Sequence, residues 1–358
     1  MTAGGNSLWK AVERLLAGAS EEGVLAHQLA PLAAVLLRPS GRVESPLWLA
    51  EEREAALRML AVVPLLRAVR ANCDGPLVLM KGPEVALRYP HSARSFWDLD
   101  VLVPNARATH EQLRENGFVE VGDPALFHRI HHLRPLAWPE LPLPVEIHSA
   151  PKWPERLHPP VPAEIIELAV PSMVPVDGIL APDPARHALL LAGHAWAHEP
   201  LLCLRDVVDV AALADEAEPG EVERLARAWR AEALWRTNEA VAGALFEAGP
   251  RPLPLRLWAR HLATARERTV LEGHLQKWLA GYSVLPLREA AWQSVSALGS
   301  DLLRAPEEGW KAKLARTRAA LRRALVPRAS HDFLLGEEAT RGRGRNPPDD
   351  DDRPVTAR

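Results

Sequence analysis

The sequence predicts an α+β fold, in which a small mixed β-sheet carries helices on one face and has helical regions before and after it along the chain. Three observations lead to this prediction. Apolar residues recur at helical spacing up to about residue 73, short apolar runs separated by turn residues follow up to about residue 150, and helical spacing then returns. With 358 residues, the chain is long enough for more than one hydrophobic core.

We expect residues 1–75 to form an N-terminal helical region. Leu8, Val12 and Leu16 recur at the spacing of one helix face. A longer pattern predicts a helix over residues 46–72, which leads through a Cys-Asp-Gly-Pro turn into the first strand.

The sheet is expected within residues 76–150. The predicted helices are residues 83–89 and 106–116, and Gly117 gives the second one a glycine stop. This count predicts four or five strands with two helices on one face. The predicted strands are residues 77–80, 98–103, 118–121 and 144–148, with one or two more within 126–138.

A proline-rich connector at residues 151–162 opens a second helical region, which we expect to extend over residues 151–336. The last residues, 337–358, have few apolar side chains and contain a run of Asp, so we expect a disordered tail. The predicted helices are residues 185–197, 201–215, 219–247, 255–280 and 289–325.

Composition narrows the class of protein. The formal net charge of -3 gives no strong attraction to nucleic acid or to an anionic membrane, which makes nucleic acid an improbable partner. The two cysteines, Cys73 and Cys203, are far apart in the sequence, which argues against a disulfide framework. We see no signal peptide, and charged residues interrupt the most apolar stretch, residues 188–210, so we expect a cytoplasmic protein without a membrane span.

Two carboxylates one residue apart, Asp98 and Asp100, stand at the head of an apolar segment that is predicted to be a strand. Side chains at i and i+2 of a strand share a face, so both carboxylates should point one way while Leu99 and Val101 point the other. Like charges on one face repel each other, and a divalent metal would remove the repulsion. Hard oxygen ligands suit Mg²⁺.

A Lys-Gly pair lies upstream of these carboxylates. Lys81 and Gly82 end a predicted strand, and Pro83 begins a predicted helix with Glu84 in its first turn. A strand, a glycine and a helix N-terminus can form a phosphate cradle, because the backbone N–H groups there are free. Pro83 has no N–H group, which removes one donor from this cradle.

A third motif follows downstream. Glu146 and His148 alternate with apolar residues in a short segment, so they should share a face of a neighbouring strand. Glu146 is then a third carboxylate beside the predicted metal site, in a position to activate an acceptor hydroxyl group.

Together these motifs resemble the nucleotidyltransferase superfamily that includes DNA polymerase beta and the aminoglycoside nucleotidyltransferases. They are most similar to its bacterial branch of uncharacterised nucleotidyltransferases. The resemblance covers residues 76–150 and continues more weakly at residues 192–194 and 204–209. The matching positions are Lys81-Gly82, Tyr89, Arg94, Asp98-Leu99-Asp100 with Leu102-Val103, and Glu146-Ile147-His148.

The resemblance implies a sheet of the nucleotidyltransferase type and the transfer of a nucleoside monophosphate from an NTP such as ATP to a hydroxyl acceptor. Asp98, Asp100 and Glu146 would be the catalytic residues and would hold two Mg²⁺ ions. The triphosphate would be bound by Lys81, Gly82 and Arg94. The acceptor would be a small molecule or a protein, enclosed by the helical region at 151–336.

Some alternatives stay open at this stage. The same fold without activity can serve as a binding or regulatory module, such as a partner in a toxin–antitoxin pair or an accessory protein of a biosynthetic cluster. A phosphotransferase would release NDP in place of pyrophosphate. Arg94 is either a phosphate ligand or a structural partner of Asp98, and His148 is more simply a supporting residue than a base.

The second helical region offers further polar residues. His194 and His198 lie four residues apart on one predicted helix, with Cys203 nearby, which raises the question of a zinc site. We prefer a packed histidine pair, because no Glu follows His194 as in a metalloprotease motif. The candidates for lining an acceptor site are His194, His198, Arg205 and Asp206.

Overall fold

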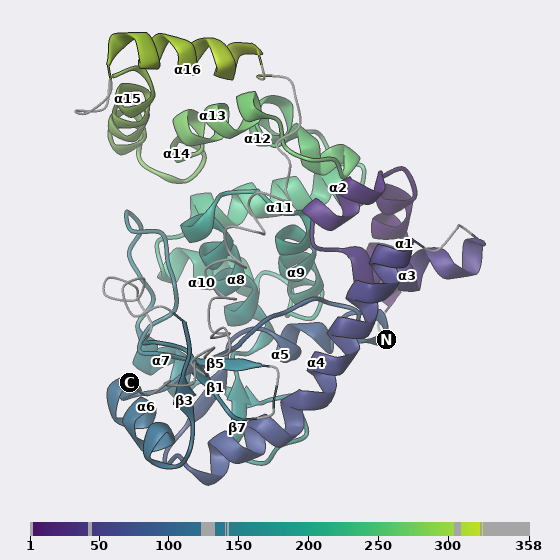
Figure 1. Ribbon diagram of the computed structural model, residues 1–358, viewed down its shortest axis with the longest axis vertical. Helices are drawn as coiled ribbons and strands as arrows, with labels where there is room; N and C mark the ends of the chain where they lie inside the picture. Colours follow the sequence, from purple (N-terminus) through teal and green to yellow (C-terminus); the bar gives the residue numbers. More distant parts are fainter. Residues whose placement is uncertain are drawn as a thin grey trace, which may run out of the picture.

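The computed structural model describes residues 3–41, 45–122, 133–139, 141, 143–303, 309–322 and 324. The protein is a mostly helical α+β fold with one mixed sheet, as the sequence predicts (Figure 1). The sheet lies at one end of the molecule, helices α8–α11 lie next to it, and the last helices, α12–α16, lie at the other end. The predicted tail at residues 337–358 lies outside the described residues, as does most of the predicted strand region at 126–138.

The sheet has seven strands in the order β3-β4-β5-β2-β1-β7-β6. β2 pairs in parallel with β5, and β1 pairs in parallel with β7, whereas the other neighbours are antiparallel. The strands are β1 (Leu77–Leu79), β2 (Leu99–Leu102), β3 (Val119–Glu120), β4 (Leu136–Ala137), β5 (Pro144–His148), β6 (Val170–Pro171) and β7 (Ile179–Ala181).

The prediction of four or five strands was wrong, because β6 and β7 come from a stretch expected to belong to the helical region. They have two and three residues, so they are too short to show alternation in the sequence. β7 exists because it pairs with β1, which lies about a hundred residues earlier. The proline in β6 is tolerated because β6 is the edge of the sheet.

The N-terminal region is helical, and the long predicted helix is present as α4. Ser45 caps α4 by accepting hydrogen bonds from the Leu47 and Trp48 amides. The predicted helix at 83–89 is shorter than expected: α5 has four residues, because Tyr89 precedes Pro90 and adopts an extended conformation. The elements are α1 (Ala3–Ala17), α2 (Glu21–Ala26), α3 (Ala30–Leu37), η1 (Arg38–Ser40), α4 (Pro46–Ala71), α5 (Pro83–Ala86), η2 (Pro90–Ser92) and α6 (Ala106–Glu115).

The second helical region begins with α7 (Pro162–Glu167) and has more, shorter helices than predicted. The expected helix at 219–247 is divided at Arg230, which has a left-handed backbone with φ 53°. The expected helix at 255–280 is divided before Thr269, which starts a new helix with a capping box. The remaining elements are α8 (Pro184–His198), α9 (Leu204–Ala214), α10 (Glu221–Ala228), α11 (Glu232–Phe246), α12 (Leu253–Leu257), η4 (Arg260–Thr264), α13 (Val270–Leu279), α14 (Gly281–Val284), α15 (Leu287–Leu302) and α16 (Trp310–Arg322).

The two faces of the sheet belong to two different hydrophobic clusters. One face packs against α4 and α6 and is lined by apolar residues at alternate positions, namely Leu77, Leu79, Leu99, Val101, Val145 and Ile147. Val78 and Leu102 point the other way and join the cluster that contains α8 and α9. On this second face β2 also carries Asp100, and β5 carries Glu146 and His148, which form the candidate site described below.

Both cysteines are buried and free. Within the described ranges, no helix combines the length and the apolar character that a bilayer span requires.

Candidate active site

A group of two carboxylates and one imidazole lies where β2 and β5 run side by side. The parallel register places Asp100 opposite Glu146 and Leu102 opposite His148. One ligand atom from each of Asp100, Glu146 and His148 lies within 4.8 Å of the other two. The Nε2 atom of His148 is 2.9 Å from Asp100 Oδ1 and 3.8 Å from Glu146 Oε2. Three potential metal ligands therefore converge on the face of the sheet that turns toward α8 and α9.

This donor set fits a divalent cation, because the two carboxylates bring negative charge and the imidazole nitrogen is a further donor. The side chain of Asp100 is 7% exposed and that of Glu146 is 18% exposed, so Glu146 is the more accessible of the two carboxylates. Of the predicted ligands, Asp100 and Glu146 come together, and His148 joins them. Asp98 directly precedes β2 and is half-buried. It is not one of the three residues of this group.

The Lys-Gly turn lies directly against the Asp98 segment. Gly82 adopts φ 62° and ψ -120°, a conformation that a residue with a Cβ atom rarely adopts. A Cβ atom at this position would lie 2.9 Å from the backbone oxygen of Asp98. Only glycine therefore allows both the turn and the close approach. Since α5 has four residues, its aligned peptide dipoles are few, and the side chain of Lys81 becomes the main positive group at this turn.

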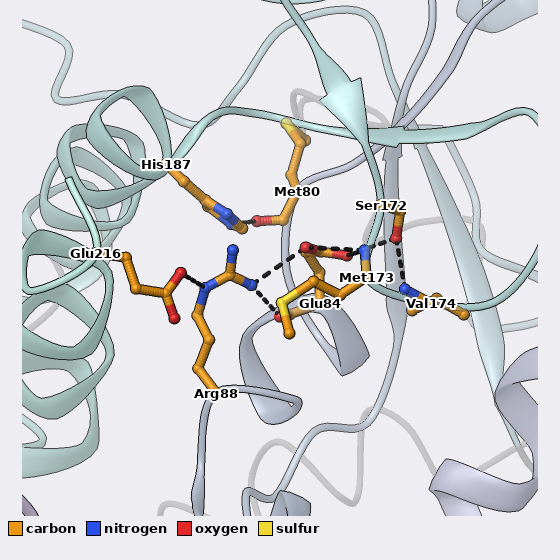
Figure 2. A network of polar contacts seen from close by, with 8 residues as sticks. All are labelled: Met80, Glu84, Arg88, Ser172, Met173, Val174, His187 and Glu216. Carbon is orange, nitrogen blue, oxygen red and sulfur yellow. Dashed lines mark hydrogen bonds and ion pairs between the residues drawn. The ribbon is translucent and has the colours of Figure 1, made fainter. Parts of the chain in front are cut away.

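A buried carboxylate holds the turn in place. Glu84 is 1% exposed and accepts hydrogen bonds from the Ser172 hydroxyl and, at 3.1 Å, from the Met173 amide (Figure 2). Arg88 donates to the Glu84 side chain and backbone, and its Nε also donates to Glu216 at 2.9 Å, just beyond the end of α9. These hydrogen bonds and ion pairs connect α5 to the segment between β6 and β7 and to the second helical region.

The side chain of Arg94 is buried and forms a two-pronged ion pair with Asp209 of α9. Its Nε donates to Asp209 Oδ1 at 2.7 Å and its Nη2 donates to Oδ2 at 2.6 Å, while the Tyr89 hydroxyl donates to Oδ1 at 2.6 Å. Burial alone would raise the pKa of Asp209, but the charge and hydrogen bonds of Arg94 lower it below its usual value. Burial and the charge of Asp209 raise the pKa of Tyr89. Asp209 is a partner of Arg94 that the sequence analysis did not identify.

Three histidines form one stripe along α8 and face the sheet. His187, His194 and His198 are spaced seven and four residues apart, which places them on one side of a helix. His187 Nε2 lies 2.6 Å from the backbone oxygen of Met80 (Figure 2), and burial lowers the pKa of His187 to about 3, so the neutral ring donates this hydrogen bond.

The two later histidines of the stripe each contact a lysine. The Nζ atom of Lys81 is 2.6 Å from His194 Nε2, and Lys152 Nζ is 2.7 Å from His198 Nδ1. Burial, followed by the charge of Lys81, lowers the pKa of His194. Cys203 donates to the backbone oxygen of His27 and belongs to no three-ligand group within the described chain, in agreement with a packed histidine pair.

Arg205 and Asp206, the other two candidates for lining an acceptor site, lie at the start of α9. Arg205 Nη2 is 3.3 Å from Asp206 Oδ1, and the Arg205 guanidinium carbon lies 5.9 Å from the centre of the Trp97 ring. Trp97 also faces Arg58 of α4 at 5.8 Å and directly precedes Asp98. Arg205 therefore contacts the segment that leads into β2, and Asp206 contacts Arg205.

The fold and site together define an α+β protein with a carboxylate–imidazole group between two parallel strands, beside a lysine–glycine turn. The chain belongs to the family described as uncharacterised nucleotidyltransferase, whose model matches residues 11–247, from α1 to the end of α11. No curated protein and no solved structure matches the chain.

Proposed function

We propose that this protein transfers a nucleoside monophosphate from an NTP to a hydroxyl group of a small molecule or protein. The observation that carries the proposal is the convergence of Asp100, Glu146 and His148 on one face of the sheet in a member of a nucleotidyltransferase family. The family implies a magnesium-bound NTP, and the donor set fits a divalent cation.

Asp98, Asp100 and Glu146 are the proposed ligands of two Mg²⁺ ions. Bound there, the cations would neutralise the triphosphate and lower the pKa of the acceptor hydroxyl. The carboxylate of Glu146 is the proposed acceptor of the hydroxyl proton, since it is the more exposed of the two grouped carboxylates. Asp100 accepts a hydrogen bond from His148 when Nε2 carries the proton, and this bond fixes the orientation of the Asp100 carboxylate.

Lys81 and Gly82 are proposed to bind the phosphates. Gly82 allows the close approach of the turn to the Asp98 segment, and Lys81 supplies the positive charge. Arg94 is the third proposed phosphate residue. Because the carboxylate of Asp209 pairs with its Nε and Nη2 atoms and balances its charge, its contribution is through the rigidity of the loop before β2.

In the proposed reaction, the acceptor oxygen forms a bond to the α-phosphorus of the NTP. The bond from this phosphorus to the bridging oxygen of the β-phosphate breaks, and pyrophosphate leaves with that oxygen. The hydroxyl proton passes to Glu146. A transfer of the γ-phosphoryl group would instead release NDP, so the leaving group distinguishes the two reactions.

The test uses the purified full chain with Mg²⁺ and a cell extract as the source of acceptor. Parallel reactions contain ATP labelled at the α- or at the γ-phosphate, and they are repeated with the other NTPs. We expect label from the α-position to enter an acceptor and pyrophosphate to be released. Asp98→Ala and Asp100→Ala should abolish the transfer, whereas Asp74→Ala, at an exposed carboxylate, should not.

Transfer of the γ-label with release of NDP would overturn the proposal in favour of a phosphotransferase. An absence of both transfer and metal-dependent NTP binding would indicate a binding module.

A further inference from the structure

We propose that Trp97 is a positioning residue for the carboxylate of Asp98. Arg58 of α4 and Arg205 of α9 hold the Trp97 ring in place. This inference rests on the proposed function, in which Asp98 is a metal ligand. Asp98 stands just before the first residue of β2, outside the strand pairing that orders Asp100, so the position of its carboxylate depends on the residues around it.

Two cations face the ring of Trp97. The guanidinium carbon of Arg58 lies 5.8 Å from the ring centre, and that of Arg205 lies 5.9 Å from it. A guanidinium group at such a distance is attracted to the electron-rich face of an indole. Since α4 precedes the sheet in the sequence and α9 follows it, the ring connects two separate helical regions.

Both arginines are confined, and their carboxylate partners satisfy them only in part. The side chain of Arg58 is 16% exposed and that of Arg205 is 14% exposed. Each makes a single 3.3 Å contact with a carboxylate of its own helix, Glu54 for Arg58 and Asp206 for Arg205. Arg58 Nη1 and Arg205 Nε are buried and have no hydrogen-bond partner in the described parts of the chain. The indole is therefore an important partner for both guanidinium groups, and the ring is restrained in return.

One face of α9 contacts the loop before β2 at both of its ends. Arg205 and Asp209 are four residues apart on α9, so they lie on the same side of this helix. Asp209 binds the start of the loop through Arg94, and Arg205 contacts its end through Trp97. The loop is thus held twice by the same helix, and the second contact lies directly before Asp98.

The turn at Gly82 restrains the backbone of Asp98. A Cβ atom at Gly82 would lie 2.9 Å from the backbone oxygen of Asp98 and 3.5 Å from the Cδ2 atom of the buried Phe96 ring. The Asp98 backbone is therefore packed against the turn, while the ring of the preceding residue is held by two cations. Restraint of this kind matters for a metal ligand, because residues that orient a ligand influence the affinity for the metal.

The experiment measures Mn²⁺ binding to the full chain by electron paramagnetic resonance. An ATP analogue with methylene in place of the α,β-bridging oxygen is present, so that no pyrophosphate can leave during the titration. Asp98→Ala identifies the Mn²⁺ ion that depends on Asp98. We expect Trp97→Leu to weaken binding of the same ion about tenfold or more. Trp97→Phe keeps an aromatic face and should retain most of the affinity. Trp292→Leu, at an exposed tryptophan of α15, is the matched control.

Two arginine variants separate position from charge. If Arg58 and Arg205 acted on the metal only through their charge, Arg58→Met and Arg205→Met would strengthen Mn²⁺ binding. Because the arginines hold the ring, each substitution should instead weaken it. Arg205→Met should have little further effect in a chain that already carries Trp97→Leu. Arg224→Met, at an exposed arginine of α10, is the control, and thermal melting of each variant verifies folding.

The outcomes distinguish the positioning role from the proposed function. Stronger Mn²⁺ binding in both arginine variants, or equal binding in Trp97→Leu and Trp292→Leu, would overturn the positioning role and leave the proposed function intact. Binding of an Asp98-dependent Mn²⁺ ion that also depends on Trp97, in a protein that transfers nothing, would support the positioning role and refute the proposed transfer.

Discussion

The two faces of the sheet show how one strand can serve both stability and chemistry. On the face toward α4 and α6, every inward residue of β2 and β5 is aliphatic and fully buried. On the opposite face, the same two strands present Asp100, Glu146 and His148 beneath α8 and α9. Side chains alternate between the two faces of a strand, so adjacent residues lie on opposite faces. Mutation of one residue should therefore affect activity, whereas mutation of its neighbour should affect stability.

Glu146→Gln should have the largest effect. Loss of the carboxylate removes a proposed metal ligand and the proposed proton acceptor, so transfer should fall about a thousandfold. The unfolding free energy should change little, since glutamine has nearly the same shape and the substitution removes a charge beside Asp100. Steady-state rates together with urea unfolding measure both effects, and unaltered turnover would remove Glu146 from the mechanism.

Asp209→Ala should have the largest effect on stability. It would leave the buried charge of Arg94 and the hydroxyl of Tyr89 without their acceptor, at a cost of about 3–5 kcal/mol. Asp206→Ala, on the same helix, should cost less than Asp209→Ala, because the Asp206 side chain is 26% exposed and makes a single 3.3 Å contact with Arg205. Chemical denaturation compares the two. If Asp209→Ala and Asp206→Ala lowered the unfolding free energy equally, the Arg94–Asp209 pair would not be what holds the sheet against α9.

Ile147→Ala changes the residue next to Glu146, on the opposite face of the sheet, and is compared with Glu146→Gln. Ile147 is fully buried on the face toward α4 and α6, so its truncation should cost about 2–5 kcal/mol of unfolding free energy. The specific activity of the folded fraction should persist, in contrast to Glu146→Gln. If Ile147→Ala instead abolished activity without lowering the unfolding free energy, the assignment of one face to stability and the other to chemistry would be wrong.

Buried histidines outside the sheet give a smaller, pH-dependent effect. His27 and His261 stack with ring centres 5.7 Å apart, and burial lowers their pKa values to about 4 and about 3. The unfolded chain binds protons near pH 6.5 and the folded chain does not, so stability should fall as pH decreases below about 6.5. Each histidine contributes a slope of about 1.4 kcal/mol per pH unit.

The pH slope can be assigned with two variants. His261→Gln should reduce the pH dependence of the unfolding free energy by the contribution of one histidine. His158→Gln, at an exposed position, should leave this pH dependence unchanged. Thermal or urea unfolding between pH 7 and 5 provides the comparison. A slope that does not differ between the two variants would contradict the low pKa of the stacked pair.

The sequence predicts the centre of this site better than its surroundings. The bounds of β5 and the opposite directions of Leu99 and Asp100 follow from alternation, which is a local pattern. The partner of Arg94 could not be predicted, because Asp209 is 115 residues away and carries no local signal of its role. The contact between Lys152 and His198 depends on the packing of Trp153 onto Gly193, which only the folded chain establishes.

The measurement that tests the central claim most directly is Mn²⁺ binding, followed by electron paramagnetic resonance, in the full chain and two variants. If the polar face of β2 and β5 holds the metal, Asp100→Asn will weaken Mn²⁺ binding at least tenfold, and Asp74→Asn, at an exposed turn, will leave it unchanged. Equal Mn²⁺ affinity in Asp100→Asn and Asp74→Asn would contradict the assignment of this face as the metal site.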